Sequence, residues 1–342
     1  MSALLEITED QLDCELIAAD GHDQSLTDKP EMAISLRGLR QSYGGLEVVR
    51  GIDLEIQRGE IFGIIGPDGA GKTSVFQILG GVMPATAGEA SVFGQPSREA
   101  RPVIGYLTQA FSLYQDLSVA ENLRYVGQLR KLQDREIAER GLHYLKLFDM
   151  DRFTDRLAGR LSGGMKQKLA LACALITEPK VLLLDEPTSG VDPLARRAFW
   201  KMINQLADRG VAVLVTTHYL EEAEQCNRLG FMVAGELVAQ GTPTGIKAEQ
   251  GGHLLELITD HPQRAAHLLQ GEMEHWRISL FGDRLHVIVD DDPLTEIGSL
   301  KRRLEPDGIR VLKAYEERYS LEDVFIGVVE KARREGKVAQ ED

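Results

Sequence analysis

An apolar run that meets a glycine-rich loop leaves this sequence few folds to adopt. Ile61–Ile65 predicts a buried strand, and Lys72–Leu79 predicts a helix. Between them, Gly66-Pro-Asp-Gly-Ala-Gly-Lys-Thr73 satisfies the pattern G-x-x-x-x-G-K followed by Ser or Thr. Gly69 and Gly71 let the backbone wrap closely, so that amide groups and the helix N-terminus point at anionic oxygens. We therefore predict a phosphate-binding loop between a strand and a helix of an α/β fold.

Two side chains at the end of this loop suit a bound phosphate. Lys72 adds a positive charge, and the hydroxyl of Thr73 can hold Mg²⁺. The alternative is an ordinary glycine-rich turn, which the flanking strand and helix disfavour.

A second apolar run ends in two carboxylates. Val181–Leu184 lacks polar alternation, which is typical of a strand buried on both faces of a parallel sheet. Asp185 and Glu186 then lie at its carboxyl end, where open α/β sheets bind their ligands. Acidic residues end many strands without any function. Beside a phosphate loop, however, Asp185 is expected to assist Mg²⁺, and Glu186 is a candidate base for a water that attacks phosphorus.

The segment Leu161-Ser-Gly-Gly-Met-Lys-Gln-Lys168 offers a second anion-binding N-terminus. Ser162 followed by two glycines opens the helix predicted up to Thr177, and the start of that helix is positively polarised. A plain capped helix is the alternative. A chain with one nucleotide does not obviously need two phosphate sites.

The order of these motifs resembles the ATP-binding cassette (ABC) ATPases. The phosphate loop, Gln109, Leu-Ser-Gly-Gly, the strand with Asp185 and Glu186, and His218 follow in that family's order, and the likeness covers about residues 33–243. The resemblance implies an α/β fold: a P-loop ABC-type nucleotide-binding domain with an antiparallel β-subdomain and a helical subdomain. It also implies ATP and Mg²⁺ as cofactors. Two copies would sandwich each ATP between the phosphate loop of one and Leu-Ser-Gly-Gly of the other.

The resemblance assigns roles to the matching positions of this sequence. Tyr43 is expected to stack on adenine, although a tyrosine in a strand commonly has no such role, and Asp192 is expected to cross the dimer interface. The expected catalytic residues are Glu186, His218, Gln109 and Lys72, and the expected Mg²⁺ ligands are Thr73, Gln109 and Asp185. The expected nucleotide-binding residues are Tyr43, Gly66, Asp68, Gly69, Ala70, Gly71, Lys72, Thr73, Ser74, Ser162, Gly163 and Gly164. Asp68 stands where many family members have Asn, but the loop acts through its backbone.

The chain divides into three expected parts. Residues 1–30, with eight acidic side chains and one basic one, read as an N-terminal tail. Residues 31–245 form the ATPase domain, with a helical subdomain at about 110–170 in which Ser118 caps a helix. Residues 246–342 show the pattern strand, helix, strand, strand, helix, strand. This order predicts a small ferredoxin-like α+β domain. A charged helix over Leu321–Arg334 is expected after it.

Charge and hydropathy restrict the cellular role. Lys and Arg number 39 against 53 for Asp and Glu, and the formal charge of −14 disfavours general nucleic-acid binding. No apolar run approaches the roughly 18 residues of a membrane-spanning helix. The first residues are acidic and lack a signal-length apolar stretch, so neither secretion nor organelle import is expected. Three widely spaced cysteines, Cys14, Cys173 and Cys226, are typical of reduced cytosolic thiols.

Two details are similar to the ABC-2 class, which includes drug-resistance cassettes: Met165-Lys-Gln-Lys168 and the segment Ser320–Ile326. The helical insertion that opens at Phe111 resembles export-type cassettes, in which a groove near Gln109 accepts a short helix of a membrane subunit. The resemblance implies a cytoplasmic ATPase on the inner face of the cell membrane that drives efflux of drugs or other small molecules through permease subunits on separate chains. The resemblance also implies a second ATPase subunit, which is expected to be a second copy of this chain. It implies no nucleic-acid partner. The alternative is a soluble ABC ATPase that acts on a ribosome or nucleic acid.

Overall fold

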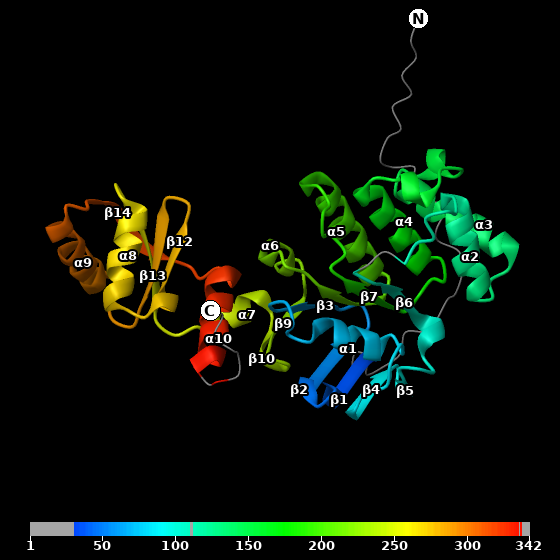
Figure 1. Ribbon diagram of the computed structural model, residues 1–342, viewed down its shortest axis with the longest axis horizontal. Helices are drawn as coiled ribbons and strands as arrows, with labels where there is room; N and C mark the ends of the chain where they lie inside the picture. Colours follow the sequence, from blue (N-terminus) through cyan, green and yellow to red (C-terminus); the bar gives the residue numbers. More distant parts are fainter. Residues whose placement is uncertain (1–30, 110–111, 335, 337–342) are drawn as a thin grey trace, which may run out of the picture. The chain divides into compact units, whose positions relative to one another are not determined.

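The computed structural model describes residues 31–109, 112–334 and 336 (Figure 1). The acidic segment 1–30 with Cys14, and also Phe111, lie outside the described residues. The described part contains an antiparallel sheet, a mostly parallel sheet and a second antiparallel sheet.

The first antiparallel sheet has the strand order β2-β1-β4-β5. Its strands are β1 (Met32–Tyr43), β2 (Leu46–Gln57), β4 (Ala87–Val92) and β5 (Gln95–Pro96). β1 is a long strand that ends at Tyr43. It stays paired with β2 up to a turn at Gly44 and Gly45, whose φ angles are 55° and 90°. These positive values explain the two glycines.

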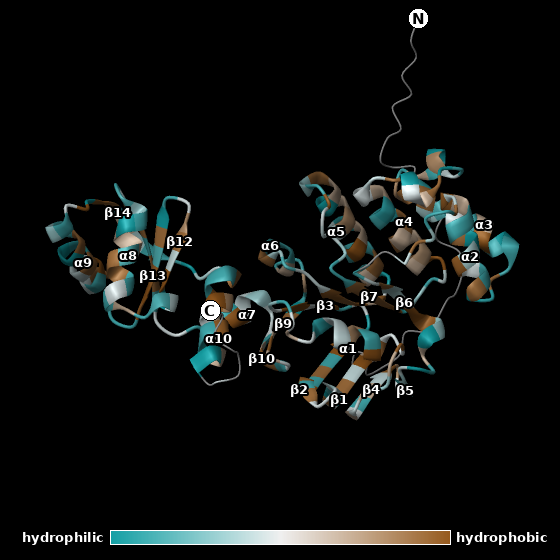
Figure 2. Ribbon diagram, viewed as in Figure 1, coloured by the Kyte–Doolittle hydropathy of each residue, from teal (hydrophilic) through white to brown (hydrophobic). Residues whose placement is uncertain are grey.

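The central sheet has the order β10-β9-β3-β8-β7-β6, in which β9, β3, β8, β7 and β6 are parallel and β10 is antiparallel to β9. Its strands are β3 (Ile61–Ile65), β6 (Ile104–Leu107), β7 (Val181–Asp185), β8 (Ala212–Thr216), β9 (Arg228–Val233) and β10 (Glu236–Gly241). Every residue of β3, β7 and β8 is buried. Figure 2 shows hydrophobic residues along β3 and β7. The prediction of a largely parallel sheet buried on both faces is confirmed.

Alternate residues of the central strands enter two separate cores. On one face, Ile64, Leu183 and Leu214 pack with β1, β2 and helix α1 (Lys72–Leu79). On the other face, Leu184 and Val215 pack with the helices that follow Gln109 in sequence. The period of two along each strand produces this division. Because both faces of the sheet are covered, the loops that could form a site lie at the ends of the strands.

The second core includes the helical subdomain. Its helices are α2 (Val119–Leu129), α3 (Asp134–Leu147) and α4 (Gly163–Leu175), and α5 (Pro193–Asp208) packs beside them. Ser118 begins α2 as predicted: its Oγ accepts a hydrogen bond from the amide of Glu121 at 3.2 Å, and the Glu121 carboxylate accepts one from the Ser118 amide at 2.7 Å. This reciprocal pair fixes the start of the helix.

The C-terminal region forms the second antiparallel sheet, with the order β12-β13-β11-β14. Its elements are β11 (His253–Thr259), α8 (Pro262–Glu272), β12 (Ile278–Phe281), β13 (Arg284–Val289), α9 (Pro293–Leu304) and β14 (Val311–Glu317). This order is that of a ferredoxin-like fold, as the sequence pattern predicts. The second strand of this region, β12, begins at Ile278, directly after a 3₁₀ turn at residues 275–277.

Helix α10 (Leu321–Arg334) lies after this sheet. Its Leu321 and Val324 join a small core with Ile65 and Phe231, next to the short helices α6 (Leu220–Ala223) and α7 (Pro243–Ala248). None of the helices in the described part of the chain is long and apolar enough to span a membrane.

Candidate functional site

The phosphate loop lies between β3 and α1, as predicted. Gly71 has φ of 101°, and a Cβ there would lie 2.3 Å from the carbonyl oxygen of Val48. A Cβ at Gly66 would lie 2.0 Å from the carbonyl oxygen of Met232. Glycine is therefore required at both positions by close backbone contacts, and at Gly71 also by its conformation.

Lys72 points back over this loop. Its Nζ donates to the carbonyl oxygens of Gly66 at 2.8 Å and Pro67 at 2.9 Å. Burial lowers the pKa of Lys72, although the charges of Asp68, Glu186 and Asp185 oppose that effect. The carboxylates of Asp68, Glu186 and Asp185 are therefore near enough to favour the charged form of Lys72.

Asp185 is buried at the end of β7, with 1% of its surface exposed. Its Oδ1 accepts a hydrogen bond from Thr216 at 2.8 Å, whereas Oδ2 has no hydrogen-bond partner. Burial raises the pKa of Asp185, whereas the hydrogen bond from Thr216 and the nearby hydroxyl of Thr73 lower it. The predicted ligands Thr73 and Asp185 therefore lie together, and the unpaired carboxylate oxygen fits a hard divalent cation such as Mg²⁺.

Glu186 is the centre of a second group of side chains. Its Oε1 lies 2.6 Å from Nε2 of His218, and its Oε2 accepts a hydrogen bond from Nε2 of Gln109 at 2.9 Å. Asp68 approaches the same imidazole nitrogen at 3.7 Å. The sequence places these residues in four separate segments, and the strand ends of the central sheet bring them together.

Gln109, which is also expected among the Mg²⁺ ligands, is bonded to Glu186 in this structure. The carboxylate and imidazole atoms of Asp68, Glu186 and His218 all lie within 4.8 Å of one another, which is a spacing that a metal ion accepts.

Tyr43 ends β1 beside the phosphate loop. Its hydroxyl lies 3.3 Å from Oγ of Ser74 and 3.2 Å from Sδ of Met83, and the residue is 44% exposed. An exposed aromatic ring beside a phosphate loop can stack on a nucleotide base. The structure thus brings the predicted residues Tyr43 and Ser74 together.

The Leu-Ser-Gly-Gly segment begins α4. The Oγ of Ser162 accepts a hydrogen bond from the amide of Met165 at 3.4 Å, which confirms the predicted cap. A Cβ at Gly163 or Gly164 would have no neighbour within 4 Å. Among the described residues, no hydrogen bond links Ser162, Gly163 or Gly164 to the phosphate loop, so a single chain does not join the two predicted phosphate sites.

Sequence reasoning missed three buried threonines that support the site. Thr216 donates to Asp185 and accepts a hydrogen bond from the amide of Glu186 at 2.8 Å. Thr188 and Thr217 both donate to Glu222 at 2.8 Å. The pair Thr216-Thr217 directly before His218 was the available signal, because a polar pair at the end of an apolar strand must find buried partners.

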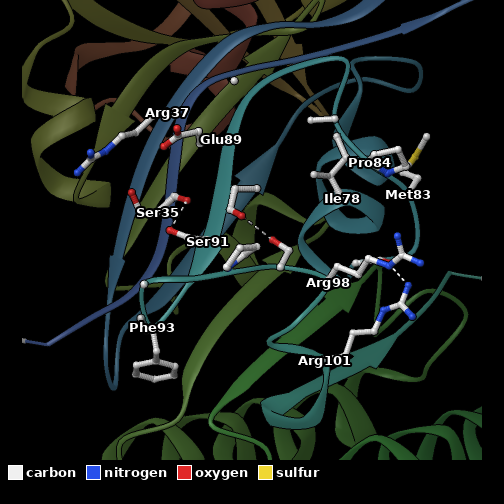
Figure 3. Close-up of a pocket in the computed structure, with 18 of the residues that line it drawn as sticks. Ser35, Arg37, Ile78, Met83, Pro84, Glu89, Ser91, Phe93, Arg98 and Arg101 are labelled. Carbon is white, nitrogen blue, oxygen red and sulfur yellow. Dashed lines mark hydrogen bonds between the residues drawn. The ribbon is translucent and has the colours of Figure 1, made fainter.

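A hollow of about 1130 Å³ lies apart from these side chains (Figure 3). It is lined by residues of the first antiparallel sheet, including Ser35 and Glu89, and by Arg98 and Arg101 of the following segment. It includes none of the predicted catalytic residues. The candidate site is therefore the group of Glu186, His218 and Gln109 at the strand ends, and not this hollow.

The chain is similar to a large group of known proteins. The sequence profile of the family described as "ABC transporter" matches residues 49–189. A probable multidrug ABC transporter ATP-binding protein, YbhF of Escherichia coli, is 42% identical over 223 residues, which cover 64% of this chain and 39% of YbhF. The chain therefore spans about two fifths of that relative. Nod factor export ATP-binding protein I of Rhizobium sp. (strain N33) is 36% identical over 302 residues, which cover 86% of this chain and 96% of the relative.

Solved structures are similar over a little less than two thirds of the chain. One, titled "Structure of ATP binding subunit of ABC transporter", has a TM-score of 0.60 and 29% identity, and the match covers 64% of this chain and 92% of that one. Another is the dimeric post-hydrolysis state of the ATP-binding cassette MJ0796 bound to ADP and Pi. It has a TM-score of 0.58 and 26% identity, and it covers 61% of this chain and 98% of that one.

Proposed function

This chain belongs to the ABC transporter ATP-binding proteins, a family of ATPases, and we propose that it powers an ABC-2 type exporter of drugs or other small molecules. The observation that carries the proposal is the group formed by Glu186, His218 and Gln109 beside the phosphate loop. A carboxylate held between an imidazole and an amide can orient and polarise a water for in-line attack on phosphorus.

The remaining catalytic roles follow from the same contacts. Glu186 acts as the base, and His218 holds its carboxylate and faces the terminal phosphate. Gln109 holds the other carboxylate oxygen. Lys72 exchanges its loop carbonyls for phosphate oxygens when ATP binds.

Mg²⁺ is the cation that the donor set fits. Thr73 and Asp185 would hold it, the latter through its unpaired Oδ2, and Gln109 would join them after leaving Glu186. Such an ion neutralises developing charge on the transferred phosphoryl group. The chain's own part is to keep the hydroxyl of Thr73 and the carboxylate of Asp185 in place.

A second copy of the chain completes the site. Ser162, Gly163 and Gly164 present open backbone at the start of α4, and a helix start attracts phosphate. The partner's phosphate loop would bring ATP to it, and Asp192, which caps α5 through hydrogen bonds of 3.1 and 3.0 Å, would lie near the contact. The dimeric cassette structures among the similar proteins support this arrangement.

A membrane subunit on a separate chain would bind next to Gln109. A hollow of about 260 Å³ there is lined by Tyr106, Tyr114, Tyr125 and Leu129 among others. Tyr114 and Tyr125 contact each other edge to face and are exposed. An exposed aromatic group is suited to an apolar helix of a partner. The proposal places the chain in the cytoplasm, on the inner face of the membrane.

The second candidate function is a soluble ATPase that acts on a ribosome or nucleic acid. The net charge of −14 disfavours it. Co-purification of the native chain with membranes supports the exporter, whereas co-purification with polysomes supports the alternative.

Glu186→Gln tests the catalytic proposal. We expect ATP hydrolysis to fall by about 10²-fold or more, because the amide cannot accept the proton. We expect the variant to form a dimer with Mg-ATP that is absent without nucleotide, as measured by size-exclusion chromatography with light scattering. Hydrolysis at the parent rate would refute the assignment of Glu186, and a variant that stays monomeric with ATP would refute the homodimer.

A further inference from the structure

Glu222 lies behind the proposed catalytic group, where sequence reasoning assigned no role. It belongs to the short helix α6 and is 6% exposed. A buried carboxylate is costly unless its oxygens have partners. The hydrogen-bond partners of Glu222 therefore indicate its structural role.

One oxygen of Glu222 holds two loops together. Its Oε2 accepts a hydrogen bond from the hydroxyl of Thr188 and another from that of Thr217, each at 2.8 Å. Thr188 follows Glu186 by two residues, and Thr217 directly precedes His218. The same carboxylate oxygen therefore ties the loop of the proposed base to the loop of its histidine.

The hydroxyl of Thr217 also shapes the turn around the histidine. It accepts a hydrogen bond from the amide of Tyr219 at 3.0 Å while it donates to Glu222. The backbone on both sides of His218 is thus fixed to one carboxylate. A loop held in this way keeps the imidazole within reach of Glu186.

Two further side chains extend the network to neighbouring helices. Nη1 of Arg196, on α5, lies 3.8 Å from the second oxygen of Glu222, and its guanidinium stacks over the ring of Tyr219 at 4.2 Å. The side-chain amide of Gln167, on α4, donates to the carbonyl oxygen of Pro187, next to Thr188. The network thus connects the helix of Leu-Ser-Gly-Gly, the loop after Glu186 and the loop of His218.

We propose that Glu222 is a positioning residue for ATP hydrolysis, which sets the separation of Glu186 and His218 through Thr188 and Thr217. The inference rests on the proposed roles of Glu186 and His218. No hydrogen bond or ion pair among the described residues links Glu222 to the phosphate loop or to Tyr43, so we expect its removal to change the chemical step and not nucleotide binding.

The test compares Glu222→Ala with Glu222→Gln in the full chain. We expect Glu222→Ala to lower kcat by about tenfold or more, because a small misplacement of catalytic groups is enough for such a loss. The KM for Mg-ATP and the Kd for a fluorescent ATP analogue should stay within about twofold of the parent. Glu222→Gln keeps an oxygen that accepts from both threonines and should restore most of the rate. Glu221→Ala is the matched control, because Glu221 is the exposed neighbour on the same helix.

Three outcomes would overturn the proposal: a kcat of Glu222→Ala within about twofold of the parent, a weakened Kd with unchanged kcat, or equal losses for the alanine and glutamine variants. If Glu222→Ala does not fold, Thr217→Val removes one of the two hydrogen bonds, and a parent kcat in that variant would also overturn the proposal. Glu186→Gln is assayed alongside. A parent rate there refutes the proposed base, whereas an inactive Glu186→Gln beside a fully active Glu222→Ala refutes the positioning role alone.

Discussion

The imidazole of His218 and the carboxylate of Glu186 lie 2.6 Å apart, between Nε2 and Oε1, beyond the ends of the parallel neighbours β8 and β7. Glu186 has a φ of 51°, which is uncommon for a residue with a Cβ. Its amide is bonded to Thr216, and its side chain is bonded at both oxygens. The surrounding contacts therefore hold a strained backbone in place, and such strain is typical of functional sites.

Removal of the imidazole should affect the reaction more than nucleotide binding. In His218→Ala, Glu186 loses its 2.6 Å partner, and we expect kcat to fall by about 10² with a smaller change in the Kd for ATP. Steady-state kinetics and equilibrium binding of a fluorescent ATP analogue would measure the two effects. His253→Ala is the control, since His253 pairs with Glu316 on the C-terminal sheet. A Kd that weakens as much as kcat falls would contradict a role in the chemical step.

Tyr43 should contribute to recognition of the base. Its ring is exposed at the end of β1, and its hydroxyl meets Ser74. We expect Tyr43→Ala to weaken ATP binding by about tenfold, because stacking of an aromatic side chain on a base has that magnitude. Tyr43→Phe keeps the ring and should bind as the parent does. Inorganic triphosphate, which has no base, should bind equally to all three proteins, and a loss there would show that the loop itself is damaged.

Much of the site could be predicted because its signals are local. The spacing of glycines before Lys72 predicts the loop, and the structure explains Gly71 by a contact with Val48 that only glycine permits. The apolar run before Asp185 predicts a strand that is buried on both faces, and β7 is such a strand. Each of these signals depends on neighbours in the sequence or on the period of one strand.

Other parts of the site depend on contacts between distant segments. Glu222 is one acid among several in its segment, and its partner Thr188 lies 34 residues earlier. The bond from Gln109 to Glu186 spans 77 residues. Composition and periodicity carry no information on such pairs, because they arise only when the strand ends come together. The end of β1 at Tyr43 depends in the same way on pairing with β2.

Gly163 should be dispensable for folding but not for hydrolysis. A Cβ there has no neighbour within 4 Å, and the position lies in the first turn of α4. We therefore expect Gly163→Ala to keep the Tm of the parent. If a second copy places its ATP against this turn, the added methyl group should lower kcat by about tenfold and weaken the ATP-dependent dimer. Gly298→Ala, on α9, is the matched control, because that position is equally open. Parent activity in Gly163→Ala would contradict the sandwich arrangement.

The C-terminal sheet and α10 should be joined more strongly at mildly acidic pH than at alkaline pH. Nδ1 of His286 lies 2.9 Å from Asp323 of α10, and its Nε2 lies 3.4 Å from Glu256, which also binds Arg284. Burial by itself lowers the pKa of His286, but the hydrogen bonds and charges of Asp323 and Glu256 outweigh it, so the pKa lies above 6.5. For Asp323 the signs are opposite. Burial by itself raises its pKa, but the hydrogen bonds from His286 and Ser320 outweigh burial, so the pKa of Asp323 is lowered.

The signs of these shifts define the pH range. A histidine with a raised pKa contributes stability below its unfolded value, about 6.5, and loses it as the pH rises through the folded pKa. Asp323, with a lowered pKa, contributes above about pH 4 and loses its share in stronger acid. The Tm of His286→Gln should therefore be lower than that of the parent by the largest margin near pH 5.5, and the margin should shrink by about pH 8.5. Exposed His267 supplies the control variant His267→Gln. A margin that stays constant across this range would show that His286 contributes by packing rather than by its charge.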